Sequence, residues 1–267
     1  MRSNQAQIVV ITGASSGIGA ISAEYLSTKG FTVILVARRV EKLAALTEKI
    51  SKKGGIAYYF ACDLSIEQER TALFATLQDK NLMPDILINN AGFGWYGHYE
   101  SMDWKTGQDL IATNVEAVAH LTHLFVPSFL KKGHGHIINV GSVVGKLPEQ
   151  GVALYSSSKA FLDAFTTSLY REFRGSGVTI SVLRLGPIKT EFFDTARSHV
   201  NGGNVPAEKM ATSAQDVAEG IYRLIQHPRK VVYIPWFQVF SPLLEVCFSW
   251  ALDLVGPLLL GKKSKPG

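Results

Sequence analysis

The sequence predicts an α/β fold: one domain built on a doubly wound parallel sheet of about seven strands, with helices on both faces. Short apolar runs rich in β-branched residues alternate with longer segments of helical periodicity, as such a sheet requires. The 267 residues suit one hydrophobic core, and neither a repeat nor a low-complexity linker interrupts them. We expect residues 1–235 to form this domain and residues 236–267 to form an apolar C-terminal extension with a basic tail.

The first strand is followed by a glycine-rich turn that suits a nucleotide. Residues 8–11 (IVVI) read as a buried strand, residues 12–19 (TGASSGIG) as the turn, and the next residues as a helix. This order presents free backbone N–H groups and the positive end of a helix to a pyrophosphate. Gly13 would permit the sharp turn, Gly17 would let the phosphates approach, and Gly19 would let the helix pack closely on the sheet. The alternative is a plain connector.

The second apolar run, residues 32–36, leads to Arg38 and Arg39. At this distance from the turn, a carboxylate normally binds the ribose 2′-hydroxyl of NAD, and two guanidinium groups stand there instead. They suit a 2′-phosphate, which guanidinium groups bind through bidentate, charge-assisted hydrogen bonds. The sequence therefore favours NADP(H) over NAD(H). The alternative is that both arginines merely begin a solvated helix.

Two further strands, residues 85–88 and 136–140, end in short polar motifs. The first is followed by residues 89–92 (NNAG) and the second by Gly141 and Ser142. In an open parallel sheet, ligands bind beyond the carboxyl ends of the strands. We therefore expect both motifs to edge the same crevice as the glycine-rich turn.

The segment YSSSK reads as helix and separates the phenol of Tyr155 from the ammonium of Lys159 by four residues. Side chains at this spacing share one helical face, so Lys159 is expected to lower the pKa of Tyr155 from about 10 towards neutrality. Such a phenol would serve as a proton donor or acceptor. The alternative is a half-buried ring beside a solvated charge.

Together these motifs resemble those of the short-chain dehydrogenase/reductase family. The matching motifs, in order and at the usual spacings, are TGASSGIG at 12–19, NNAG at 89–92, Asn114, Ser142 and YSSSK at 155–159. The resemblance runs from about Gln7 to Ile234 and implies a Rossmann-type fold and an NADP-preferring oxidoreductase.

The resemblance also implies roles for individual residues. Tyr155 is implied as the acid/base, and Lys159 as the group that lowers its pKa and holds the nicotinamide ribose. Ser142 is implied to orient the substrate carbonyl, Asn114 to kink a helix and hold a water in a proton relay, and Asp63 to bind the adenine amino group. The positions implied for the cofactor are Gly13, Ser15, Ser16, Gly17, Ile18, Gly19, Arg38, Arg39, Asp63, Leu64, Asn90, Ala91, Gly92, Tyr155, Lys159, Gly186, Ile188 and Thr190.

After the sixth strand the chain departs from the family pattern, because Leu185 stands where the family usually has a proline. Proline fixes φ, so we expect a looser turn here. Gly186, Ile188 and Thr190 keep their places, and contacts to the nicotinamide carboxamide are therefore expected to survive.

Residues 191–212 show no strand pattern and no clear helix signal. Segments of this length are usually functional or disordered, and this one follows the nicotinamide turn, so we expect a lid over the substrate. The apolar side chains nearby predict a small apolar ketone or aldehyde, or a secondary alcohol, as substrate. The side chains expected to line the substrate site are Ser142, Tyr155, Trp95, Val144 and Phe192. The alternative is that several of the apolar ones close the core.

Residues 236–260 are nearly all apolar. Ser241 followed by Pro242 predicts a helix start, and Pro257 predicts a stop near Val255. The resulting helix of about fourteen residues would measure about 21 Å. It is too short to cross a hydrocarbon core of about 30 Å.

Glu245, Ser249 and Asp253 fall four residues apart and would draw one polar stripe along this helix. Such a helix lies flat in a membrane surface, or packs against a partner subunit or the substrate pocket. The lysines of residues 262–265 (KKSK) favour anionic lipid. Peripheral membrane contact through residues 236–265 therefore stays open beside packing in a homo-oligomer, for which we expect a homodimer or homotetramer.

Composition argues against several other classes of protein. The net charge of +5 is dispersed and no nucleic-acid module accompanies it, so we expect no nucleic-acid partner. Neither cysteines nor a carboxylate cluster joins the closely spaced histidines, so we expect no metal site. With only Cys62 and Cys247, and without a signal-like N-terminal run, the chain is expected in the cytoplasm, with membrane association only at the surface.

The leading hypothesis is reversible hydride transfer between NADPH and a ketone or aldehyde, as in hydroxysteroid, 3-oxoacyl and general carbonyl reductases. Tyr155 and Ser142 would donate hydrogen bonds to the carbonyl oxygen, and Tyr155 would supply the proton. One alternative is a catalytically silent protein that senses NADP(H). Another is a membrane-tethering or assembly module that acts through the C-terminal helix.

Overall fold

Seven parallel strands form one sheet in the part of the chain that the structure describes, as expected. The structure is a computed structural model and describes residues 6–203 and 211–259. The strand order is β3-β2-β1-β4-β5-β6-β7, and every neighbouring pair is parallel. The strands are β1 (Ile8–Thr12), β2 (Thr32–Ala37), β3 (Ile56–Ala61), β4 (Ile86–Asn89), β5 (Gly135–Ser142), β6 (Val178–Leu185) and β7 (Val231–Ile234).

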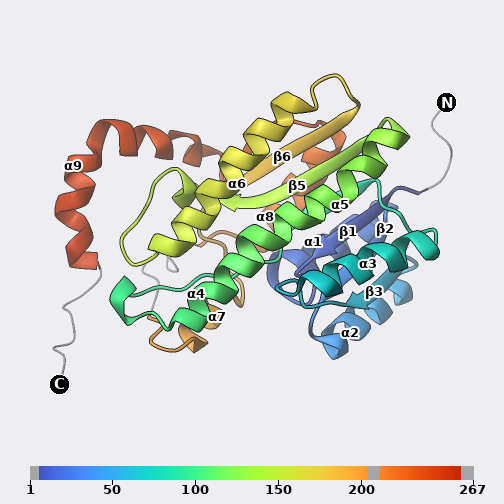
Figure 1. Cartoon of the computed structure of the whole chain (residues 1–267), viewed down its shortest axis with the longest axis horizontal. Coiled ribbons are helices and arrows are strands. Elements are labelled where there is room, and N and C mark those ends of the chain that lie inside the picture. The colour runs from blue at the N-terminus through green and yellow to red at the C-terminus, as the bar shows by residue number, and fades with distance from the viewer. Residues whose placement is uncertain (1–5, 204–210, 260–267) are drawn as a thin grey trace.

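Helices cover both faces of the sheet (Figure 1). Apolar residues of α1, α2 and α8 pack on one face, and those of α3, α5 and α6 pack on the other. The α-helices are α1 (Gly17–Thr28), α2 (Val40–Lys52), α3 (Glu67–Asp79), α4 (Trp104–Ile111), α5 (Ala117–Lys132), α6 (Ala153–Glu172), α7 (Phe192–Ser198), α8 (Ala214–Gln226) and α9 (Ser241–Leu259). Parallel strands covered on both faces have no solvent side, which explains their continuous apolar runs.

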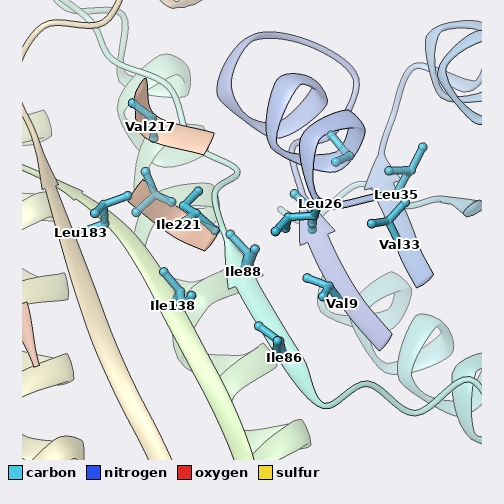
Figure 2. Close-up of a cluster of buried hydrophobic side chains, with 14 of the residues drawn as sticks. Val9, Leu26, Val33, Leu35, Ile86, Ile88, Ile138, Leu183, Val217 and Ile221 are labelled. Carbon is cyan, nitrogen blue, oxygen red and sulfur yellow. The ribbon is translucent and has the colours of Figure 1, made fainter. Parts of the chain in front are cut away.

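Successive residues of each central strand point to opposite faces and join different clusters. Val9 of β1 is buried in the cluster under α1 and α8, whereas Val10 is buried in the cluster under α3 and α5. Figure 2 shows the first cluster, where side chains from five neighbouring strands meet Leu26 of α1 and Ile221 of α8. This continuous core fixes the position of the strand ends.

The order of the strands reverses beside β1, and this reversal creates the crevice of the fold. From β1 the chain passes to β2 and β3 on one side, and then crosses to β4 on the other. The loops that follow the strands on the two sides of such a switch point diverge from each other, which leaves a crevice at the carboxyl ends of the strands. Thr12, Asn89 and Ser142 are the last residues of β1, β4 and β5, so the turns that follow them meet there.

Helix α9 differs from the predicted straight helix in two ways. It continues past Val255 through Pro257 to Leu259, and its backbone leaves the helical region at Phe248 (φ −134°, ψ 20°). A proline at 257 leaves the carbonyl of Asp253 without its helical partner, and Asp253 is exposed, so water can take that place. The predicted stop near Val255 is therefore wrong.

The break at Phe248 divides α9 into two arms that point in different directions (Figure 1). Glu245 lies on the first arm, whereas Ser249 and Asp253 lie on the second, so the single polar stripe predicted for a straight helix is also wrong. No helix within residues 6–203 and 211–259 combines the length and apolarity that crossing a bilayer requires.

The predicted lid, residues 191–212, contains helix α7 at its beginning. Ile188 and Thr212 form an isolated parallel bridge that joins the two ends of the segment. Residues 204–210, in the second half of the predicted lid, lie outside the described residues.

Candidate active site

Tyr155, Lys159 and Ser142 lie together where β5 ends beside α6. Tyr155 is the third residue of α6, and the Nζ of Lys159 is 5.6 Å from the centroid of its ring. Lys159 is buried and donates to the carbonyl oxygen of Val140 at 2.9 Å. The two side chains share one helical face, as the spacing predicts, but the ammonium group uses this hydrogen bond on the β5 backbone.

Burial dominates the ionisation of both groups. It raises the pKa of Tyr155 well above the usual value for a phenol, and a hydrogen bond with Ser142 only partly opposes this rise. Burial also lowers the pKa of Lys159 to about 8, against the attraction of the nearby Asp163 carboxylate. The predicted lowering of the Tyr155 pKa by Lys159 is therefore wrong for this geometry, because desolvation outweighs it.

Ser142 is held at the junction of β5 and β6. Its hydroxyl donates to the carbonyl oxygen of Leu185 at 3.2 Å and accepts from the backbone N–H of Val144 at 3.4 Å. The side chain is buried, so these two contacts restrict where its oxygen can lie.

Asn114 lies in a π-helical turn, Ala112–Glu116, between α4 and α5, which is the helix irregularity that the resemblance implies. Its Oδ1 accepts from the backbone N–H of Phe93 at 3.1 Å, and its Nδ2 donates to the carbonyl oxygen of Phe93 at 2.9 Å. The Nδ2 also donates to the Ser158 hydroxyl at 3.2 Å. Asn114 therefore ties the segment after β4 to α6, whereas its part in a proton relay stays a prediction.

The glycine-rich turn packs directly against the NNAG segment. Gly13 has a φ of +67°, and a Cβ there would lie 2.9 Å from the Cα of Ala91. A Cβ on Gly19 would lie 2.4 Å from the carbonyl oxygen of Gly13. The Asn90 amide donates to the carbonyl oxygen of Thr12 at 2.9 Å. Only glycine fits at these two positions, and the turn is held against the end of β4.

The remaining positions implied for the phosphates gather around the start of α1. Gly17 has a φ of +54° and faces the side chain of Thr190, with 3.2 Å between a Cβ placed there and the Cβ of Thr190. Ile18 is partly buried against the core under α1. The hydroxyls of Ser15 and Ser16 accept hydrogen bonds from Arg39, at 3.1 and 2.5 Å. Hydroxyls, a guanidinium and the positive end of α1 form a donor set that suits phosphate groups.

The two arginines predicted for the 2′-phosphate have different surroundings. Arg38 is mostly exposed, and its Nη1 lies 3.7 Å from the Asp63 carboxylate. The Arg39 guanidinium donates hydrogen bonds to the glycine-rich turn and also to Glu191, at 3.0 Å. Both guanidinium groups lie at the expected strand end, and each has an acidic neighbour that the sequence analysis did not foresee.

The Asp63 carboxylate accepts hydrogen bonds from the backbone N–H and the hydroxyl of Ser65, at 3.0 and 2.7 Å. These bonds and the Arg38 charge lower its pKa against the opposing effect of burial, so Asp63 is ionised at neutral pH. The neighbouring Leu64 is buried in the core under α3. The Asp63 carboxylate is therefore partly exposed beside Arg38, whereas the Leu64 side chain packs in the core.

The turn after β6 is hydrogen-bonded to β7, and the expectation that Leu185 makes it looser than in the family stays a prediction. The backbone N–H of Gly186 donates to the carbonyl oxygen of Ile234 at 2.9 Å, and Leu185 itself is buried. Ile188 is buried too, and the Thr190 hydroxyl accepts from the backbone N–H of Phe192 at 3.2 Å. A backbone hydrogen bond thus holds this turn to the end of β7.

The predicted substrate-side residues separate into two groups. The Phe192 ring lies 5.5 Å from the Tyr155 ring, and Val144 is half-buried after Ser142. Trp95 is only 2% exposed and donates from Nε1 to the carbonyl oxygen of Val200 at 3.1 Å. Trp95 therefore closes the core beside the lid segment, as the alternative interpretation held, and the structure gives it no free face toward a substrate.

Two acidic residues near the site were missed by the sequence analysis. Asp163 lies one turn after Lys159, is 1% exposed, and binds the Nε of Arg184 through Oδ1 at 2.7 Å. Its four-residue spacing from Lys159 is a signal that the sequence contains. Glu191 carries no comparable local signal, because its partners are distant in sequence. Among the described residues, no group of three or more His, Cys, Asp or Glu side chains could hold a metal ion.

Known proteins resemble the chain in sequence and in fold. A family model described as short chain dehydrogenase matches residues 7–201. The chain is 31% identical over 230 residues to a sulfoacetaldehyde reductase of Chromohalobacter salexigens, covering 84% of this chain and 89% of the relative. It is 33% identical over 221 residues to a 3-oxoacyl-(acyl-carrier-protein) reductase of Haemophilus influenzae, covering 81% and 89%.

Solved structures of similar proteins include complexes with nicotinamide cofactors. A short-chain dehydrogenase from Sphingobium yanoikuyae in complex with NADPH aligns with a TM-score of 0.78 and 28% identity, covering 98% of each chain. A metagenomic short-chain oxidoreductase in complex with NADP aligns with a TM-score of 0.72 and 33% identity, covering 85% of this chain and 94% of the other.

Proposed function

The chain belongs to the short-chain dehydrogenase family, and we propose that it transfers hydride reversibly between NADP(H) and an apolar ketone or aldehyde, or the matching secondary alcohol. It is an NADP-dependent oxidoreductase of this family. The observation that carries the proposed chemistry is the placement of three side chains at the carboxyl end of β5. Ser142 ends that strand, and the Lys159 ammonium lies 5.6 Å from the centroid of the Tyr155 ring.

The residues that would hold the cofactor run along the crevice. Gly13 would permit the sharp turn and Gly17 would let the backbone approach the phosphates. Arg38 and Arg39 would supply cations for the 2′-phosphate, and Lys159 would hold the nicotinamide ribose. When bound, NADPH supplies the hydride. The protein's contribution is to orient the carbonyl and to move the proton.

Tyr155 is the proton donor in this proposal. Because burial keeps its pKa high, the phenol is protonated at neutral pH and suits the reduction direction, in which a carbonyl oxygen must gain a proton. Ser142 would donate a second hydrogen bond to the same oxygen. In the oxidation direction, the Lys159 charge and the positive end of α6 would favour the phenolate.

The substrate class follows from the surroundings of Tyr155. Phe192 and Val144 offer apolar surface beside the phenol and Ser142. We therefore favour apolar ketones and aldehydes, including hydroxysteroid and 3-oxoacyl types, over charged substrates such as sulfoacetaldehyde. Segment 191–198, which carries Phe192, would cover the substrate.

A substrate screen tests this proposal. The purified protein would be mixed with NADPH and a panel of ketones, aldehydes, oxosteroids and 3-oxoacyl thioesters, and the loss of reduced-cofactor absorbance would be followed, with NADH as control. Turnover with apolar carbonyls and NADPH is expected. Tight NADPH binding without turnover of any panel member would instead support the silent NADP(H)-sensing protein.

A second proposal concerns the C-terminal extension, which we infer to be a surface for anionic lipid. The apolar side chains of residues 236–251 and of Leu254 point mostly to solvent, with Trp236 74%, Val246 79% and Trp250 69% exposed. Exposed apolar residues occur on both arms of α9, and neither arm is long enough to cross a bilayer. The lysines of residues 262–265 follow directly in sequence, which supports an anionic membrane surface over a neutral one.

Vesicle sedimentation tests the lipid proposal. The full chain is expected to bind vesicles of phosphatidylcholine with phosphatidylglycerol and to bind pure phosphatidylcholine less. Trp236→Ser combined with Trp250→Ser should abolish binding, whereas Trp104→Ser, which removes an exposed tryptophan on α4, should leave it unchanged. If the double variant instead turns a homodimer or homotetramer into monomers, and no vesicle binding occurs, the surface joins copies of the chain and the lipid proposal is wrong.

The expected cytoplasmic location and oligomeric state remain predictions.

A further inference from the structure

Glu191 joins the start of the lid segment to the cationic end of β2. It directly follows Thr190 and precedes α7. Its Oε2 accepts from Nη1 of Arg39 at 3.0 Å, and its Oε1 accepts from Nζ of Lys42 at 2.9 Å. Each carboxylate oxygen therefore has its own cationic donor, and the partners are about 150 residues away in sequence.

Each of the three nitrogens of the Arg39 guanidinium has a hydrogen-bond partner in this arrangement. Its Nε and Nη2 donate to the hydroxyls of Ser15 and Ser16, and its Nη1 donates to Glu191. The carboxylate thus holds one edge of the cationic group that the proposed function assigns to the 2′-phosphate. Carboxylate and phosphate oxygens bind guanidinium and ammonium groups in the same way, so an incoming phosphate would compete for the same donors.

The other side of Glu191 leads to the proposed substrate site. Its carbonyl oxygen accepts from the backbone N–H of Thr195 at 2.9 Å and so begins α7. The next residue, Phe192, lies against the Tyr155 ring with 5.5 Å between the centroids. Glu191 therefore connects the cations assigned to the cofactor phosphate with Phe192, the side chain that lies against the phenol ring.

The ion pairs of Glu191 are open to exchange. The side chains of Arg39, Lys42 and Glu191 are each about half exposed (45%, 46% and 48%), so a phosphate in solution can reach them. Hydrogen bonds from Lys42 and Arg39 lower the pKa of Glu191 to about 2, so the carboxylate is ionised at every working pH. Exposed pairs of this kind are individually weak, so that a phosphate can displace them.

We propose that Glu191 is a latch that competes with the 2′-phosphate of NADP(H) for Arg39 and Lys42, and so limits the preference for NADP(H) over NAD(H). The inference rests on the proposed function, because it takes NADP(H) as the ligand of Arg39. NADPH must displace the carboxylate, and with it the attachment of segment 191–198, whereas NADH leaves the latch in place. Binding of the 2′-phosphate would then release segment 191–198, which covers the phenol.

The test compares Glu191→Gln with wild type in titrations followed by tryptophan fluorescence. The amide keeps the size of the side chain and removes its charge. NADPH should bind Glu191→Gln about three- to tenfold more tightly, whereas the Kd for NADH should change by less than about twofold. Asp194→Asn is the control, because Asp194 lies on the same helix and pairs with Arg197 instead of the cations at the end of β2.

Adenosine 2′-phosphate and adenosine 5′-phosphate serve as smaller probes in the same titration. Glu191→Gln should tighten the binding of the first and leave the second unchanged, and the difference should shrink in high salt. Unchanged or weaker NADPH binding by Glu191→Gln, in a protein that binds NADPH and reduces carbonyls, would overturn the latch alone. Failure of the wild type to bind NADPH at all would overturn the proposed function as well.

Discussion

The two ends of the crevice differ in burial and in the interactions that hold them. The phenol end comprises Asn114, Ser142, Tyr155 and Lys159. The guanidinium end comprises Arg38, Arg39, Asp63 and Glu191. Hydrogen bonds to the backbone hold the first, as between Lys159 and Val140, whereas the second contains ion pairs that are largely open to water. The comparison shows that packing and desolvation determine the arrangement and ionisation of the phenol end. Salt-sensitive attraction between charges determines the arrangement of the guanidinium end.

The largest effect is expected at the phenol end, from Tyr155→Phe. The variant keeps the ring and its contact with Phe192 but loses the proton donor, so turnover of a confirmed substrate should fall by about 10²- to 10⁴-fold. The Kd for NADPH should stay within about twofold. Tyr170→Phe, a half-buried tyrosine on the same helix, is the control. Turnover close to wild type in Tyr155→Phe would show that the acid lies elsewhere.

The next largest effect is expected from Gly13→Val at the glycine-rich turn. Its Cβ would come within 2.9 Å of Ala91, at a φ of +67°, so the turn must shift and NADPH affinity should fall by more than roughly tenfold. Gly54→Val is the matched control, because Gly54 also has a positive φ (+81°) but no neighbour within 4 Å. If both variants lose the same affinity, close packing on the NNAG segment is not the cause.

A pH series separates the buried lysine from the exposed cations. The pKa of Lys159 is about 8 in the folded protein and about 10.4 in an unfolded chain, so between these values the unfolded state holds the extra proton. The free energy of unfolding should therefore rise with pH in this window, by at most about 1.4 kcal/mol per pH unit from this group. Urea unfolding at pH 8.0 and 9.5 should show a smaller rise for Lys159→Met than for wild type. Equal slopes would contradict the lowered pKa.

The smallest effects are expected at the guanidinium end. Arg39→Gln should weaken NADPH binding by about tenfold, and Arg38→Gln, whose side chain is more exposed, by about threefold. Both losses should diminish as ionic strength rises, and NADH binding should stay nearly constant. Titrations at low and high salt provide the measurement. An equal loss for NADH would mean that these arginines support the fold of the turn and do not select the phosphate.

Much of the fold and of the crevice was predictable, because its determinants are local in sequence. The strand runs, the positive φ at Gly13 and the four-residue spacing of Tyr155 and Lys159 are each visible within a few residues. The glycine-rich turn, the NNAG segment and Ser142 meet at one edge of the sheet, as expected from their places at strand ends.

What the sequence analysis missed depends on contacts between distant segments or on burial. Glu191 meets Arg39 across about 150 residues, and no local pattern reports such a pair. The raised pKa of Tyr155 comes from desolvation, which spacing along a helix cannot reveal. The sequence predicts Trp95 as a side chain of the substrate site. In the structure its indole N–H donates to the carbonyl oxygen of Val200, and the ring is buried in the interior. The break at Phe248 follows from no proline or glycine at that position.

If the C-terminal extension binds lipid as proposed, the place where it leaves the domain would affect how substrate arrives. Pro235 and Gln238 lie against Gly186, so the extension departs from the same turn that carries Thr190. A bilayer that holds the extension would thus sit close to the mouth of the crevice. A hydrophobic ketone dissolved among acyl chains would then reach Tyr155 by lateral diffusion, and its partition coefficient, more than its solubility in water, would set the apparent KM.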